Sequence, residues 1–140
     1  MEYRRFNDKY VVRLQKGEEL IESILKLARE ENISLGRVSG LAAVDKVQIS
    51  LYAADTKEYL IKELTGDMEI VSLEGNIAEK DGEAYLHLHG SVAHEENRVY
   101  GGHMHYARVS VTAELIVDVI DGKVDRQFDE ATGANLWKFN

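Results

Sequence analysis

Four of the five histidines of this chain lie in two short segments, YLHLHG at residues 85–90 and GGHMH at residues 101–105. Histidine is the commonest metal ligand in proteins, and alternate residues of a β-strand project to the same face. Around the first segment the even-numbered positions are apolar and would face a core: Ala84, Leu86, Leu88 and Val92. His87 and His89 then share the opposite face at a spacing of about 6 to 7 Å, which allows both imidazoles to reach one ion.

An HxH pair also describes two polar residues on a strand face that meets water, so a third ligand is needed. His103 can supply it, because Gly101 and Gly102 just before it let the backbone bend or approach a neighbouring strand closely. Three neutral imidazoles favour Zn²⁺ or a similar divalent transition metal. Three protein ligands leave a fourth position open to water or to a small-molecule ligand.

One amphipathic helix is predicted within residues 16–33. Its apolar face has helical spacing and consists of Leu20, Ile24, Leu27 and Ala28. Gly17 is the expected cap, and Asn32 can adopt the left-handed turn that ends the helix. The basic residues scattered over 1–16 fit a solvated first strand ahead of it.

The rest of the chain has the period-two pattern of β-strands. Strands are expected at residues 10–14, 47–52, 68–77, 83–93 and 109–120. Asp81-Gly82 predicts a hairpin turn between the third and fourth of these. In the second, Val47, Ile49 and Leu51 are expected on one face, and in the last a row of apolar residues is expected to face the core: Val109, Val111, Ala113, Leu115, Val117 and Val119.

The C-terminal tail brings its apolar residues after a polar turn and is expected to pack back on the body: Phe128, Leu136, Trp137 and Phe139. At 140 residues the chain fits one compact domain, residues 1–140. These patterns predict an α+β fold, in which one main N-terminal helix packs on a largely antiparallel sheet.

Composition narrows the function classes. With 25 acidic and 17 basic residues the net charge is −8, which opposes extended contact with a phosphate backbone. The absence of cysteine excludes disulfides, thiolate ligands and a cysteine nucleophile. No apolar run is long enough to span a membrane, so a soluble, cytoplasmic protein is expected. No serine triad, phosphate loop or dinucleotide fingerprint is found.

Five segments in order resemble the blocks of the PPC domain (plants and prokaryotes conserved domain), a family of largely undefined biochemical activity. They are SGLAAV at 39–44, GDMEIVSLEGNI at 66–77, YLHLHG at 85–90, GGHM at 101–104 and TAELIV at 112–117. The resemblance covers essentially the whole chain. One departure is Ala42, where the family usually has glycine.

The resemblance implies a small α+β domain that assembles as a homotrimer. The stand-alone prokaryotic members resemble metal-binding proteins whose ligands match His87, His89 and His103 here. His105 does not fall on a recurrent histidine of that pattern, and is expected beside the site or at the surface. His94, in a polar loop, is expected to be solvated.

In plants the domain is joined to AT-hook DNA-binding motifs. An AT-hook needs a proline-containing core, and this chain has no proline. Together with the charge of −8, this disfavours direct DNA binding.

Two interpretations remain open. In the first, the trimer is a metal-dependent binder or enzyme, with Glu114 and Tyr85 as candidate catalytic residues; each can equally be a structural or solvated side chain. In the second, the domain is a trimeric interaction module, DNA-associated only by family analogy, with a structural metal or none. The residues do not show whether any reaction is catalysed.

Overall fold

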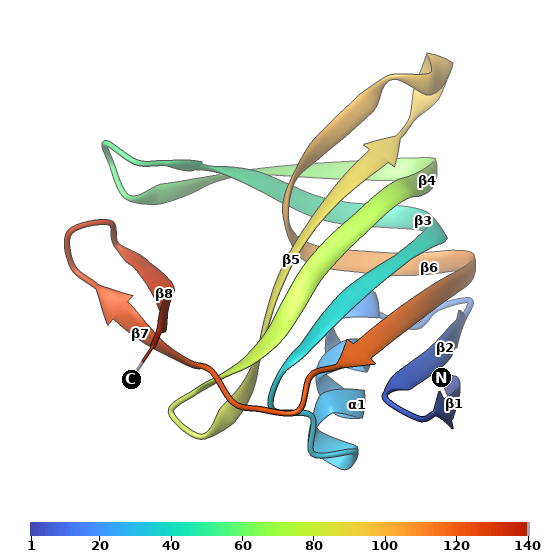
Figure 1. The fold of residues 1–140 in the computed structure, drawn as a ribbon. Helices are drawn as coiled ribbons and strands as arrows, with labels where there is room; N and C mark the ends of the chain where they lie inside the picture. The colour runs from blue at the N-terminus through green and yellow to red at the C-terminus, as the bar shows by residue number, and fades with distance from the viewer. Residues whose placement is uncertain (140) are drawn as a thin grey trace.

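The computed structural model describes residues 1–139 as a curled, mostly antiparallel sheet covered by one α-helix (Figure 1). The elements run β1 Glu2–Phe6, β2 Lys9–Gln15, α1 Leu20–Glu30, β3 Gly36–Ala53, β4 Glu58–Lys80, β5 Glu83–Ala93, a 3-10 turn η1 Glu95–Asn97, β6 Val99–Val119, β7 Asp125–Asp129 and β8 Ala134–Lys138. The expected α+β class, with one N-terminal helix on an antiparallel sheet, is confirmed. Within residues 1–139, no helix has the length and apolar character needed to cross a bilayer.

Four long strands form a closed circuit of pairings. β3 pairs with β4, β4 with β5, β5 with β6, and β6 returns to β3, all antiparallel. β2 and then β1 extend the sheet from β6, while β7 and β8 form a hairpin that meets β4 through one parallel bridge, Glu79 with Asp125. This closure brings β5 and β6 side by side, which the order of the strands in the sequence does not require.

The helix packs against β5 and β6 with the face that its spacing predicts, because Leu20, Ile24 and Leu27 are buried. Its N-cap is Glu19 rather than the expected Gly17. The Glu19 carboxylate accepts hydrogen bonds from the backbone N–H groups of Ile21, Glu22 and, on β6, Ala107, at 2.6 to 3.1 Å. Asn32 has a φ of 54°, so the predicted left-handed turn after the helix is confirmed.

Two details of the predicted strand faces are wrong. The β3–β6 register shifts between Ala42 and Val44, and Val111, expected in the core, is 69% exposed. Between the pairs Ala42–Ala113 and Val44–Val109, β6 has three residues where β3 has one, so Val111 lies in a bulge that does not pair with β3. On β3, Leu51 is 65% exposed while its neighbour Ser50 is 4% exposed, so the expected apolar face of Val47, Ile49 and Leu51 fails at Leu51.

The C-terminal hairpin packs back on the body as expected, but not through all of its apolar residues. Phe128, Leu136, Trp137 and Phe139 remain substantially exposed. The attachment is instead polar: Arg126 on β7 donates to Oδ1 of Asn76 on β4 at 2.8 Å. In Figure 1 the hairpin stands to the side of β4 and β5, away from α1.

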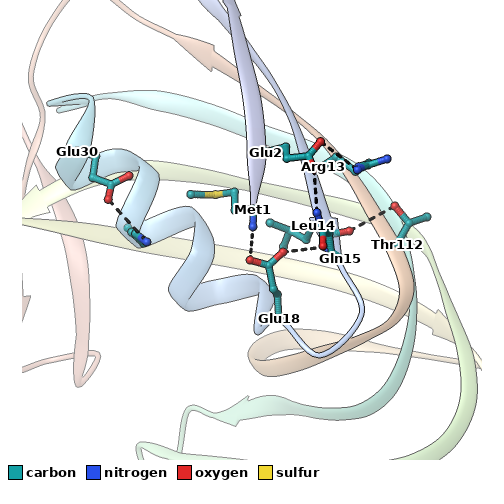
Figure 2. A network of polar contacts seen from close by, with 9 residues as sticks. Met1, Glu2, Arg13, Leu14, Gln15, Glu18, Glu30 and Thr112 are labelled. Atoms are coloured by element: carbon teal, nitrogen blue, oxygen red, sulfur yellow. Dashed lines mark hydrogen bonds and ion pairs between the residues drawn. The ribbon is translucent and has the colours of Figure 1, made fainter.

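Polar contacts attach the exposed first strand to the start of the helix (Figure 2). The Met1 amine donates to Glu18, and the other Glu18 oxygen accepts from the Gln15 backbone N–H at 2.7 Å. Glu2 accepts from Arg13 at 3.0 Å and from the Gln15 side chain at 2.8 Å. These contacts lie on β1, β2 and the segment before α1, so they support the sheet edge rather than the histidine site.

Candidate metal centre

Two neighbouring strands position the three histidines. His87 and His89 are on β5, and His103 on β6 lies directly opposite His89 in the register. Their approach depends on glycine, because a side chain at Gly102 would overlap the backbone carbonyl of Ser50 on β3. The predicted role of Gly102 in a close backbone approach is therefore confirmed, whereas a side chain at Gly101 would meet its nearest atom at 3.3 Å.

The three imidazoles converge on one point. One nitrogen from each of His87, His89 and His103 lies within 4.8 Å of the other two. The Nε2 atoms of His87 and His89 are 3.2 Å apart. Two nitrogens bound tetrahedrally to zinc at their usual bond lengths are separated by about 3.3 Å, so this pair needs almost no movement to share an ion.

Burial favours the neutral, metal-binding form of two of these rings, His87 and His103. Partial burial, reinforced by the neighbouring histidines, lowers the pKa of His103 to about 4. Burial, then the charge of Arg126 and His89, also lowers the pKa of His87. Nδ1 of His103 is buried and has no hydrogen-bond partner among residues 1–139. The donor set therefore fits a divalent transition metal of the zinc type.

The other two histidines have separate partners. His105 lies beside the cluster, its ring 4.7 Å from that of His103, and its Nε2 is 2.6 Å from the Ser50 hydroxyl. His94 is not simply solvated, because its Nε2 is 3.0 Å from the Thr65 carbonyl oxygen. His105 thus takes the expected place next to the site.

Two pockets open onto the cluster. The larger, of about 570 Å³, meets His87 and His89 and is lined also by Arg37, Glu74 and Trp137. The smaller, of about 280 Å³, meets His87 and His103. Its remaining lining is Tyr59, Asn76, Tyr85, Arg126, Ala134, Asn135, Leu136 and Trp137. Each of the three histidines therefore lines at least one pocket, and His87 lines both.

The candidate catalytic residues lie in different places. Tyr85 lines the smaller pocket, and its hydroxyl accepts a hydrogen bond from the Asn135 amide at 3.4 Å. Glu114 lies opposite Leu41 on β3, whereas His103 lies opposite Ser50 much further along the same strand. Glu114 lines neither of the two pockets.

Sequence patterns missed the side chains that the C-terminal hairpin adds, above all Arg126, Asn135 and Trp137. The tail was expected to pack on the body, but no local pattern says which strand receives it. Arg126 contacts Asn76 and reaches the histidines only because β7 pairs with the far end of β4.

The structure is that of a small protein with a mostly antiparallel sheet, one helix and a three-histidine cluster. Comparison with known families then shows which family it belongs to. The Plants and Prokaryotes Conserved (PCC) domain, the domain abbreviated PPC above, matches residues 1–121. This chain belongs to that family.

Solved structures share the fold over nearly the whole chain. A metal-containing protein from Archaeoglobus fulgidus is 32% identical, with a TM-score of 0.87 over 99% of this chain and 97% of its own. A plant- and prokaryote-conserved protein from Pyrococcus horikoshii is 30% identical, with a TM-score of 0.87 over 99% and 94%. A protein from Bacteroides thetaiotaomicron, named as a candidate DNA-binding protein, is 26% identical, with a TM-score of 0.96 over 99% and 96%.

Among curated proteins, bifunctional protein GlmU from Synechococcus sp. strain JA-3-3Ab is 35% identical over 128 residues. The match covers 89% of this chain but 19% of the relative, so the chain spans about a fifth of that protein's length. The likeness thus concerns one part of a much longer protein.

Proposed function

We propose that this chain is a metal-binding PPC-domain protein, in which His87, His89 and His103 hold Zn²⁺ or a similar divalent ion. The observation that carries the proposal is the convergence of three imidazole nitrogens within 4.8 Å. The depressed pKa values of His87 and His103 add support, because they leave the ligand nitrogens unprotonated at neutral pH. The Archaeoglobus relative, named as a metal-containing protein, points the same way.

The ion is proposed to be accessible rather than purely structural. A closed structural site normally has four protein ligands, and this cluster has three. Both pockets reach the histidines, so a small molecule can approach them. A zinc ion at such a site would supply Lewis acidity and lower the pKa of bound water to about 7. Tyr85, which lines the smaller pocket, would orient a ligand bound there. The alternative function for the chain is an interaction module in which the metal is structural.

A homotrimer is proposed as the assembly. Apolar side chains on three neighbouring strands point away from the core and are exposed in the single chain: Leu41 on β3, Val71 on β4 and Val111 on β6. Exposed apolar residues on adjoining strands commonly mark a surface that another subunit covers.

We do not propose direct DNA binding, although the Bacteroides thetaiotaomicron relative is named for it. The net charge of −8 repels a phosphate backbone. Several of the basic side chains are also paired with carboxylates, for example Arg37 with Glu74 and Arg108 with Asp45.

The metal proposal is tested by elemental analysis of protein purified without a histidine tag or added metal. We expect close to one transition-metal equivalent per chain. His87→Ala and His103→Ala should lose it, because two imidazoles bind zinc far more weakly than three. His94→Ala is the matched control and should keep the metal, since His94 bonds Thr65 outside the cluster.

Wild-type protein that contains no metal and binds added zinc only weakly would refute the site. Chelation distinguishes the two roles of the ion. If the metal is accessible and functional, the metal-free protein keeps its circular dichroism spectrum and melting temperature. A large fall in melting temperature on chelation would favour the structural role.

A further inference from the structure

The guanidinium of Arg126 is buried beside the histidine cluster and is only partly matched by acceptors. Arg126 is 8% exposed. One terminal nitrogen donates to the Asn135 carbonyl oxygen at 2.7 Å, and the other donates to Oδ1 of Asn76 at 2.8 Å. Its Nε is buried without a hydrogen-bond partner in residues 1–139. A guanidinium has five N–H donors, so donors remain for a further acceptor.

No carboxylate of residues 1–139 forms an ion pair with this guanidinium. Glu74, which lies opposite His89 in the register, is bound by Arg37 at 2.9 Å, and Asp125 is paired with Lys123 at 3.5 Å. A buried charge without a partner is costly, and a divalent ion on the histidines would add more positive charge nearby. The site as built therefore attracts an anion.

His87 supplies an independent reason for an acceptor at this place. Its Nε2 faces His89, while its Nδ1 lies 3.5 Å from a terminal nitrogen of Arg126. When Nε2 binds a metal, the proton of the neutral ring sits on Nδ1, and ligating histidines usually donate that N–H to an acceptor. Here Nδ1–H would face a guanidinium, which can only donate. An oxygen atom to one side of the pair, at hydrogen-bond distance from each nitrogen, would accept from both.

The walls of the 280 Å³ pocket indicate what carries that oxygen. The ring centroid of Tyr85 is 4.9 Å from Cζ of Arg126, and that of Trp137 is 5.7 Å away. Tyr59 and Leu136 also line the pocket. Aromatic and apolar walls favour a small organic body, and the planar fork of arginine matches the two oxygens of a carboxylate.

We propose that the pocket between Arg126 and the three histidines binds a small organic carboxylate, whose oxygens accept from Arg126 and from Nδ1–H of His87. The proposal rests on the proposed metal site for the second of these contacts, but the Arg126 contact does not require a metal. All of β7 and β8 lies beyond residues 1–121, the part that matches the family. The C-terminal hairpin supplies Arg126, Asn135 and Trp137 to this pocket.

The test is isothermal titration calorimetry with benzoate as the probe and the neutral isostere benzamide as its control. Metal content is measured on the same samples. Benzoate should bind the zinc-loaded wild-type protein, and benzamide should bind at least tenfold more weakly because it lacks the charge. Arg126→Gln should weaken benzoate binding at least tenfold at unchanged metal content. Arg37→Gln, on the exposed arginine of the larger pocket, is the matched control and should bind benzoate like the wild type.

The outcomes separate this proposal from the metal proposal. If the protein holds zinc but does not distinguish benzoate from benzamide, or if Arg126→Gln binds benzoate normally, the carboxylate site is refuted and the metal site stands. If the protein holds no metal, the metal proposal fails, and titration of the metal-free wild type and Arg126→Gln decides the carboxylate site by itself. Inorganic phosphate that binds as tightly as benzoate would refute the choice of an organic carboxylate.

Should Arg126→Gln not fold, Arg126→Lys keeps the positive charge but removes the planar fork. It is expected to bind benzoate more weakly than the wild type and still to prefer it over benzamide. Equal affinity of this variant for benzoate and benzamide would count against the proposal. Equal affinity of the wild type for the two compounds would also count against it.

Discussion

At the residue scale, the geometry of the three-histidine cluster depends on one glycine, Gly102. Gly102 precedes His103 in β6, and its α-carbon packs against the backbone of Ser50 on β3. The same residue pairs with Gly90 on β5, next to His89. A side chain here would push β6 away from β3 and so displace His103 from its partners.

We expect Gly102→Ala to destabilise the protein by about 1 to 3 kcal/mol, the range for forced overpacking of a well-packed site. It should also reduce metal retention, because the added methyl group moves His103. Gly101→Ala is the control and should cost less, since its new methyl group would meet its nearest neighbour at 3.3 Å. Urea denaturation and elemental analysis measure both effects; equal behaviour of the two variants would contradict the assignment to Gly102.

At the element scale, α1 is joined to the sheet through its N-cap. The Glu19 carboxylate holds two N–H groups of the first turn and the Ala107 N–H of β6. A helix N-terminus favours a negative charge because its first N–H groups lack partners within the helix. One side chain thus both starts the helix and fixes its position on β6, some distance along that strand from His103.

Glu19→Ala is therefore expected to lower the free energy of unfolding by about 1 to 2 kcal/mol, the usual cost of losing a cap. Metal content should stay unchanged, since Glu19 does not line either pocket at the histidines. Glu30→Ala, at the exposed far end of the helix (Figure 2), should change the unfolding free energy by less than about 0.5 kcal/mol. Loss of metal in Glu19→Ala at full stability would show that the helix supports the site directly.

At the scale of the whole molecule, the curled sheet leaves an apolar surface uncovered. Leu41, Val71 and Val111 are exposed on its central strands, and the bulge in β6 is what turns Val111 outward. Covering such residues contributes roughly 25 cal/mol per Å² of apolar area, enough over a full interface to hold subunits together.

We expect light scattering to give a mass of about three times the 15.8 kDa chain. Val111→Glu should shift this mass toward the monomer, because it places a charge in the proposed interface. Phe128→Glu, at an equally exposed apolar residue of the C-terminal hairpin, should leave the trimer intact. A monomeric wild type would refute the trimer. If Phe128→Glu dissociates the assembly and Val111→Glu does not, the interface lies at the C-terminal hairpin instead.

Local patterns in the sequence predicted much of the fold. The helix face followed from the spacing of Leu20, Ile24 and Leu27, and the β4–β5 hairpin followed from Asp81-Gly82, whose residues both have positive φ. Alternation put His87 and His89 on one face. These predictions succeeded because helical spacing, turn geometry and strand alternation depend only on residues near one another in the chain.

Only the tertiary structure decided which side chains meet at the site. Closure of the sheet placed His103 opposite His89, and a bulge in β6, which follows from pairing with a distant strand, left Val111 exposed. Docking of β7 on β4 brought Arg126 within 3.5 Å of His87, 39 positions away in the chain. Such contacts are set by pairing and packing between distant segments, so the sequence predicted the three histidines and the shared face of His87 and His89, whereas the fold determined the pocket around them.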